Sequence, residues 1–247
     1  MSTANDNFKS PFNPQDLPVW AKRVVVFDTE TTGLDLRDAR IVTACLAELD
    51  ENGQIVGQAL EWLADPKIEI PEAASNVHGV TTEYARAHGR DAAEVVAEIL
   101  AKIAEYQMAG VAIVAYNAPY DFTILHFEAI RHGLSPIAEP SPVLDPLVID
   151  KFADQFRKGK RKLEITAEYY GIPLSDAHNA TADAVAAGRV LQAIAAKHAA
   201  KLPATADEIH AAQVGWSASQ DESFAKWMRG NVNPDFVTNI GWPLKLS

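Results

Sequence analysis

The sequence predicts an α/β protein built around one main domain. Three short apolar runs rich in β-branched residues come first, at residues 23–27, 40–49 and 54–63. Helical patterns and short apolar runs then alternate, as strands and helices do in an α/β sheet. With 247 residues, of which 48% are hydrophobic, the chain can bury a sizeable core.

The elements are expected in the following order. Residues 1–18 are rich in Asn, Ser and Pro and read as a flexible leader. The Asp-Glu-Asn-Gly sequence at 50–53 suits a hairpin, so the first three strands should be antiparallel. Strands are then expected near 111–116 and 143–144, and helices over 91–106, 119–132, 146–156, 163–170 and 179–201. We therefore expect a leader (1–18), a domain (19–202) and a helical or loop extension packed on it (203–247).

Composition narrows the classes of function. The net charge of −11 argues against tight non-specific binding to duplex nucleic acid, whose phosphates are neutralised by Lys and Arg. No stretch approaches the roughly 18 consecutive apolar residues of a membrane span, and the single cysteine, Cys45, cannot form an internal disulfide. A cytoplasmic protein without membrane contact is expected.

The first candidate site residues are Asp28 and Glu30, at the end of the first predicted strand. Side chains alternate across a strand, so both acids point to the same face, where they could share a hard cation. Taken alone, such a pair is more often simply solvated.

Two further acids are found near predicted helix starts. Asp121 follows Asn117, a natural helix cap, and an acid in a first helical turn is favoured by the macrodipole without any function. If Asn179 caps the next long helix, Asp183 lies about one turn inside that helix. His178 then remains on the preceding loop, where its ordinary pKa suits it to accept a proton from water near neutral pH, although a lone loop histidine is more often a surface residue.

Together these residues match one chemistry. Phosphodiester hydrolysis is well served by two cations about 3.5–4 Å apart, and four carboxylates with one base meet that need. Oxygen ligands without a Cys or His cluster predict Mg²⁺ or Mn²⁺ rather than zinc.

The three segments at 27–34, 117–121 and 178–184 closely resemble the motifs of the DEDDh (DnaQ-like) 3'-to-5' exonucleases. That family includes the proofreading subunit of bacterial DNA polymerase III and ribonuclease T. The resemblance covers about residues 24–200 and implies a ribonuclease H-like fold, with a mixed five-stranded sheet flanked by helices. It further implies that Asp28 bridges two metal ions, Glu30 and Asp183 complete one site, Asp121 holds the second ion, and His178 is the general base.

Substrate contacts are also implied. The resemblance places the turn after the first strand against the terminal nucleotide, with Leu34 pressing on its base, and makes His78 and the second-motif Asn117 candidate contacts; an ordinary turn histidine is the alternative reading of His78. Tyr116 stands where a histidine often precedes the asparagine of the second motif. The expected contacts in the turn are Thr31, Thr32, Gly33 and Leu34.

The basic run at 157–162 is dense for an acidic chain, and Lys158, Lys160 and Arg161 are candidate phosphate contacts. A solvated loop is the alternative.

In the tail, aromatic and glutamine side chains recur at helical spacing between residues 213 and 227, and such a stripe more often packs on its own domain than on a partner. No polymerase-binding segment is recognised there.

The predicted function is metal-dependent removal of nucleoside 5'-monophosphates from single-stranded or frayed DNA 3' ends. Trimming of RNA 3' ends is the enzymatic alternative. A non-catalytic nucleic-acid-binding module would be expected to lack at least one acid or the base, yet all five residues are present.

Overall fold

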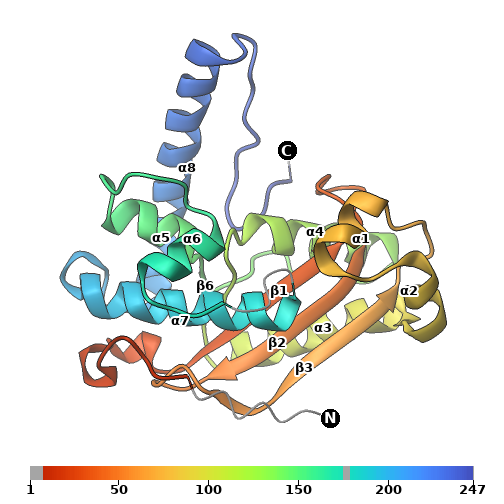
Figure 1. Ribbon diagram of the computed structural model, residues 1–247, viewed down its shortest axis with the longest axis horizontal. Helices are drawn as coiled ribbons and strands as arrows, with labels where there is room; N and C mark the ends of the chain where they lie inside the picture. Colours follow the sequence, from red (N-terminus) through yellow and green to blue (C-terminus); the bar gives the residue numbers. More distant parts are fainter. Residues whose placement is uncertain (1–7, 175–178, 247) are drawn as a thin grey trace.

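A computed structural model describes residues 8–174 and 179–246, and its centre is a mixed six-stranded sheet in the order β4-β3-β2-β1-β5-β6 (Figure 1). The strands are β1 (Val24–Thr31), β2 (Ile41–Leu49), β3 (Ile55–Asp65), β4 (Arg90–Asp91), β5 (Ile113–Val114) and β6 (Val143–Leu144). The helices are α1 (Glu72–His78), α2 (Thr82–His88), α3 (Ala92–Met108), α4 (Pro119–Arg131), α5 (Pro146–Ala153), α6 (Leu163–Tyr169), α7 (Ala180–His198) and α8 (Ala206–Asn231). Short 3₁₀ turns lie at Pro14–Asp16, Val19–Ala21 and Ala199–Lys201.

The first three strands form the antiparallel half of the sheet, as predicted. The turn between β2 and β3 is held by Asp50, whose Oδ1 accepts hydrogen bonds from the amides of Asn52 (2.8 Å) and Gln54 (2.9 Å). Gly53 adopts a left-handed φ of 72°, which glycine reaches without steric penalty. This turn connects β2 to β3 in the register that puts Cys45 opposite Glu61.

The remaining strands are short and parallel to their neighbours. β5 pairs with β1 and β6 pairs with β5, which completes the five expected strands. The sixth, β4, is a two-residue strand beside the end of β3. It was not predicted because two exposed charged residues carry no apolar pattern.

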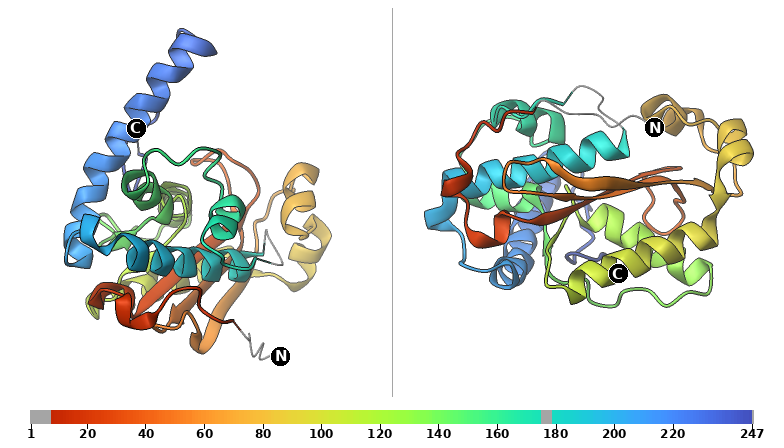
Figure 2. Two further views of the ribbon diagram at one scale, coloured as in Figure 1. Left: turned by 60° about the vertical axis from the view of Figure 1, so that its left-hand side comes forward. Right: turned by 90° about the horizontal axis from the view of Figure 1, so that it is seen from below.

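Helices cover both faces of the sheet (Figure 2). α7 lies along β1 and β2 on one face, and α3 packs with α4 on the other. Gly188 lets α7 approach closely, because a Cβ at this position would lie 2.4 Å from Val26 Cγ1 and 2.6 Å from Leu49 Cδ1. The backbone of α7, which carries Asp183, is therefore held directly on the strand that carries Asp28 and Glu30.

The two ends of the described chain pack on this domain to different extents. Residues 1–7 of the expected leader lie outside the described residues. From Phe8 onward the segment packs on the domain: Phe8 and Leu17 are buried in the core, and the Arg189 guanidinium lies 3.8 Å from the centre of the Phe8 ring. The first half of α8 is packed through Ile209 and Gln213, whereas its second half projects from the body (Figure 1).

Within residues 8–174 and 179–246, no helix is long and apolar enough to cross a lipid bilayer.

Candidate active site

Asp28 and Glu30 lie on β1, which continues to Thr31 beyond the predicted end of the apolar run. Their partners across the sheet are Cys45 and Thr43 on β2, so the two acids share one face, as strand alternation requires. The pairing shifts register just after Glu30, and the strand ends one residue later at Thr31. A rigid, paired strand therefore positions both carboxylates.

Asp183 reaches the same point from α7. Carboxylate oxygens of Asp28, Glu30 and Asp183 all lie within 4.8 Å of one another, a spacing that one cation could bridge. The predicted cap is present, because Asn179 Oδ1 accepts the amides of Thr181 (3.0 Å) and Ala182 (3.2 Å). The helix start that places Asp183 is thus fixed by its own N-cap.

Asp121 lies at the open edge of β1. β5 pairs only with Val25 and Val26, so the Thr29 amide beyond them donates to Asp121 Oδ1 instead, at 2.9 Å. The Thr29 hydroxyl donates to the same oxygen at 2.8 Å. Asp121 is therefore locked to the residue between Asp28 and Glu30, although it is not one of the three acids within 4.8 Å.

Burial is the main reason that Asp28, Glu30 and Asp121 have raised pKa values. Burial, followed by repulsion from Asp121, Glu30 and Asp183, holds the pKa of Asp28 well above its usual range. Burial and the charges of Asp183 and Asp121 raise the pKa of Glu30 to about 8. Burial raises the pKa of Asp121 to about 7 against the hydrogen bonds from Thr29, which lower it. The cluster is a site of concentrated negative charge that a cation would relieve.

Asp145 is a supporting residue that the sequence did not reveal. Its fully buried carboxylate accepts the amides of Asn117 (2.9 Å), Ala118 (3.0 Å) and Leu147 (2.9 Å). Asn117 does not cap α4 as expected; it adopts a left-handed φ of 65°, and Ala118 takes the cap position. Asp145 thereby holds the turn that starts the helix of Asp121.

α8 completes this support. Gln213 is fully buried, and its Oε1 accepts the Asp145 amide at 2.7 Å while its Nε2 donates to the Val143 carbonyl at 2.9 Å. Sequence periodicity placed Gln213 in a helical stripe but gave no sign of its partner. The C-terminal extension is thus connected by hydrogen bonds to the start of α4.

The turn after β1 is ordered by polar contacts. Thr31 Oγ1 donates to the Gly33 carbonyl at 2.8 Å, and the Tyr120 hydroxyl donates to the same carbonyl at 2.9 Å. Thr32 Oγ1 accepts the Arg40 amide at 2.9 Å. Leu34 is 86% exposed, so its side chain is available for contact beside the ordered turn.

His78 ends α1, and its Nδ1 accepts the Val80 amide at 3.2 Å. Burial lowers the pKa of His78, and the Thr31 backbone partly opposes that shift, which places the ring beside the end of β1. This position is close to the turn after β1.

The predicted phosphate contacts differ in exposure. Lys158 and Lys160 are exposed, whereas Arg161 is largely buried and donates to Asp150, to the Asp154 carbonyl at 2.7 Å and to the Arg157 carbonyl at 2.9 Å. The guanidinium of Arg161 is therefore engaged inside the protein.

His178 lies outside the described residues.

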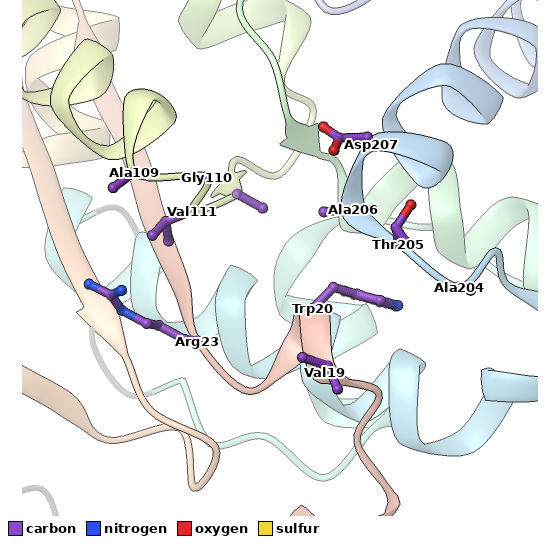
Figure 3. Close-up of a pocket in the computed structure, with 11 residues that line it drawn as sticks. Val19, Trp20, Arg23, Ala109, Gly110, Val111, Ala204, Thr205, Ala206 and Asp207 are labelled. Carbon is purple, nitrogen blue, oxygen red and sulfur yellow. The ribbon is translucent and has the colours of Figure 1, made fainter.

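A cavity of about 370 Å³ lies away from the four acids, between Trp20, Gly110 and Thr205 (Figure 3). It opens near the start of β1 rather than its end, and none of the four acids lines it.

Known proteins resemble this chain in sequence and in fold. A protein-family model described as an exonuclease, RNase T type, matches residues 25–191. PolC-type DNA polymerase III of Lacticaseibacillus paracasei is 30% identical over 189 residues, and that of Pediococcus pentosaceus is 26% identical over 186 residues. The alignments cover 76% and 75% of this chain but only 12% of each polymerase.

The fold comparison agrees. E. coli exonuclease I in complex with a dA16 oligonucleotide superposes with a TM-score of 0.60 at 20% identity, over 70% of this chain and 40% of that one. Exonuclease I from Methylocaldum szegediense gives a TM-score of 0.58 at 19% identity, over 70% and 40% of the two chains. The predicted ribonuclease H-like α/β fold is confirmed, with one strand more than the five expected.

The family match covers more than half of the chain and includes Asp28, Glu30, Asp121 and Asp183. This protein therefore belongs to the RNase T-type exonuclease family, the DnaQ-like 3'-to-5' exonucleases, which are divalent-metal-dependent hydrolases.

Proposed function

We propose that the chain removes nucleoside 5'-monophosphates from the 3' ends of single-stranded or frayed DNA, using two divalent cations, Mg²⁺ or Mn²⁺. The observation that carries this proposal is that carboxylate oxygens of Asp28, Glu30 and Asp183 lie within 4.8 Å of one another. Asp121 is held beside them, because it accepts a hydrogen bond from the amide of Thr29 on β1. DNA is favoured as substrate because the similar proteins are DNA polymerases and an exonuclease I in complex with a deoxyribonucleotide strand.

The residues fit hard cations. Each offers carboxylate oxygen, the ligand that Mg²⁺ and Mn²⁺ prefer, and burial together with mutual repulsion favours a counter-ion at this point. Asp28, Glu30 and Asp183 would hold one ion, and Asp28 with Asp121 the other. When bound, such cations stabilise charge on the phosphate and promote ionisation of the attacking water.

The remaining roles belong to the surrounding chain. Thr31, Thr32, Gly33 and Leu34 are proposed to receive the terminal nucleotide, with His78 and Asn117 at its border. His178, directly before the α7 cap residue Asn179, is proposed to accept the proton of the attacking water. Lys158 and Lys160 are proposed to contact phosphates farther along the strand.

A product-resolved digestion tests the function. Single-stranded, mismatched and fully paired DNA, and RNA of the same sequence, carry a 5' label and are incubated with Mg²⁺ or Mn²⁺, with and without EDTA. The proposal predicts a ladder of DNA shortened one nucleotide at a time, slower for paired ends and absent with EDTA. Faster digestion of the RNA strand would instead assign the chain to RNA trimming.

Substitutions at the site test the roles. Asp28→Asn should lower the cleavage rate more than about a hundredfold, beyond the 10–100-fold that loss of a ligand's hydrogen-bond partner costs. His178→Ala should lower kcat by about 10²–10⁴-fold, the range for general base catalysis, with little change in the cation requirement. Parent-like rates in a folded Asp28→Asn variant would contradict the metal site.

A further inference from the structure

The loop between α5 and α6, residues 154–162, displays an aromatic ring among lysines; we call it the α5–α6 loop. Phe156 is 89% exposed, and Lys158, Lys160 and Lys162 are exposed beside it. A single exposed apolar residue is ordinary on a protein surface. The loop merits a functional explanation because of the way in which the structure holds it.

The base of the loop is a buried ionic cluster. The carboxylate of Asp150, on α5, is fully buried and accepts hydrogen bonds from both Arg157 and Arg161. The Tyr170 hydroxyl donates to its other oxygen at 2.8 Å. Two of the loop's five cations are thus used internally, and its three lysines face solvent.

Arg161 also closes the loop around Phe156. Its Nη2 donates to the carbonyls of Asp154 (2.7 Å) and Arg157 (2.9 Å), which lie on the two sides of Phe156 in sequence. The Arg157 guanidinium lies 4.4 Å from the centre of the Tyr169 ring. The backbone that carries Phe156 is therefore restrained while its ring faces solvent.

The loop is connected to the active site. The Tyr116 hydroxyl donates to the Arg161 carbonyl at 2.7 Å, and Tyr116 directly precedes Asn117 in the turn that starts α4. α6, which follows the loop, packs on α7, the helix of Asp183. Figure 2 shows α6 and the segment before it on the same side of the sheet as α7.

A buried ionic cluster of this kind adds little to the free energy of unfolding, because removing the charges from water offsets much of their attraction. Replacing a buried ion pair by hydrophobic residues of similar volume often leaves a protein as stable as before, so the cluster suits a need for one defined loop conformation. That conformation presents an aromatic face and several ammonium groups in a chain of net charge −11. Single-stranded nucleic acid is bound by this combination, because bases stack on rings and phosphates attract cations.

We propose that Phe156 stacks on a base of the single strand upstream of the 3' terminal nucleotide, while Lys158 and Lys160 contact the flanking phosphates. This assignment rests on the proposed function, since it concerns how the same strand is held. The α5–α6 loop would then be a subsite that only strands longer than the terminal nucleotides can reach.

The test compares a long with a short substrate. For each protein, kcat/KM is measured on the oligonucleotide dT12 and on the dinucleotide dT2, and the ratio of the two values is the readout. Phe156→Ala should lower this ratio about tenfold, within the range that base–aromatic stacking contributes. Phe156→Trp should keep the ratio, whereas Phe156→Leu, which retains apolar volume without a ring, should lower it.

The matched control is Met108→Ala, because Met108 is an exposed apolar residue (84%) at the end of α3 on the other face of the sheet. It should keep the parent ratio. An unchanged ratio in Phe156→Ala, or a parent-like ratio in Phe156→Leu, would overturn the stacking subsite while the proposed function stands. Failure of the parent to degrade dT12 with either cation would instead remove the proposed function.

Discussion

Asp28, Glu30 and Asp183 bring three like charges to one point, and this crowding makes the fold sensitive to pH. Glu30 has a pKa of about 8 in the folded chain against an ordinary 4.5, and Asp121 one of about 7 against 3.8. Because the folded state holds these protons more tightly, the carboxyls contribute stability below their ordinary pKa values. That contribution is lost progressively as pH rises from the ordinary pKa values, 3.8 and 4.5, and is gone once pH passes about 7 to 8.

The first prediction is that added cation stabilises the chain more at pH 8 than at pH 6. At pH 6 bound protons already relieve the repulsion, whereas at pH 8 the cation meets ionised carboxylates. The melting temperature, measured with EDTA and with Mg²⁺ at each pH, reports the difference; about 2–4 °C corresponds to each kcal/mol at this chain length.

Asp28→Asn is the control for this measurement. With one charge removed, the EDTA-treated variant should melt above the parent at pH 8 and should gain less from Mg²⁺. An equal Mg²⁺ shift at both pH values in the parent would argue against a cation held by these acids.

At the scale of single residues, the sequence predicts that the two acids on β1 share one face, but it does not predict which residues hold the acids on the helices in place. Alternation along β1 is enough to put Asp28 and Glu30 on one face. Asp121 and Asp183 looked like ordinary first-turn acids until the family motifs joined them. Asp145 could not be recognised at all, because an acid followed by Pro146 matches a simple helix N-cap, and its bonds to the Asn117 turn come from tertiary structure.

Among the elements, α8 has a connection to the candidate active site that its position in the chain does not suggest. It follows the part of the chain matched by the family model, yet Gln213 bonds the backbone of Asp145, which in turn holds the start of α4. A change that breaks the hydrogen bond between α8 and Asp145 should therefore alter the position of Asp121.

The second prediction concerns Gln213→Met, which keeps the side-chain volume but removes both hydrogen bonds. We expect the cation concentration for half-maximal activity to rise about tenfold, the lower end of the effect of supporting residues on metal sites. Activity is titrated with Mn²⁺ on one DNA strand, and unfolding is followed in parallel.

Gln220→Met is the matched control. Gln220 lies on the same helix, and its Nε2 donates to the Val148 carbonyl at 3.0 Å, without a bond to Asp145. Both variants should lose about 1–3 kcal/mol of stability, but only Gln213→Met should change the cation requirement. If the two variants need the same Mn²⁺ concentration for half-maximal activity, Gln213 contributes to packing and stability only.

The elements that the sequence missed are short or polar. α1 and α2 have seven residues each and too few apolar positions to show a period. β1 extends past Phe27 through polar residues because pairing with β2 and the bond to Asp121 stabilise it, neither of which a local pattern contains. The long α3 and α7, by contrast, were predicted nearly to their ends.

Over the whole molecule, the net charge of −11 makes the position of each exposed cation important. A chain that repels phosphate in general must attract it locally, and the α5–α6 loop, which carries the exposed Lys158 and Lys160, lies on the same side of the sheet as α7 (Figure 2). Lys22 is also exposed but lies just before β1, at the end of the strand farther from Asp28 and Glu30.

The third prediction follows from this asymmetry. Lys160→Glu should weaken binding to a dT12 strand and reduce the slope of log affinity against log salt by about 0.7, the contribution of one phosphate contact on a single strand. Lys22→Glu changes the net charge equally and should leave the slope unchanged. Binding is measured by fluorescence anisotropy in Ca²⁺; equal slopes for the two variants would disprove a local contact.

The contact of Gly188 with Val26 and Leu49 sets the distance between α7 and the sheet. Asp183 lies on α7 and Asp28 on β1. The distance between this helix and the sheet therefore sets the space for the cation that we propose to lie between their carboxylates. Gly188→Ala would act as a spacer one methyl thick. Relative to the parent, it should raise the ratio of the activity with Mn²⁺ to the activity with Mg²⁺, because Mg²⁺ requires shorter bonds, of about 2.0–2.1 Å. A glycine without any polar atom would then influence which cation is accepted.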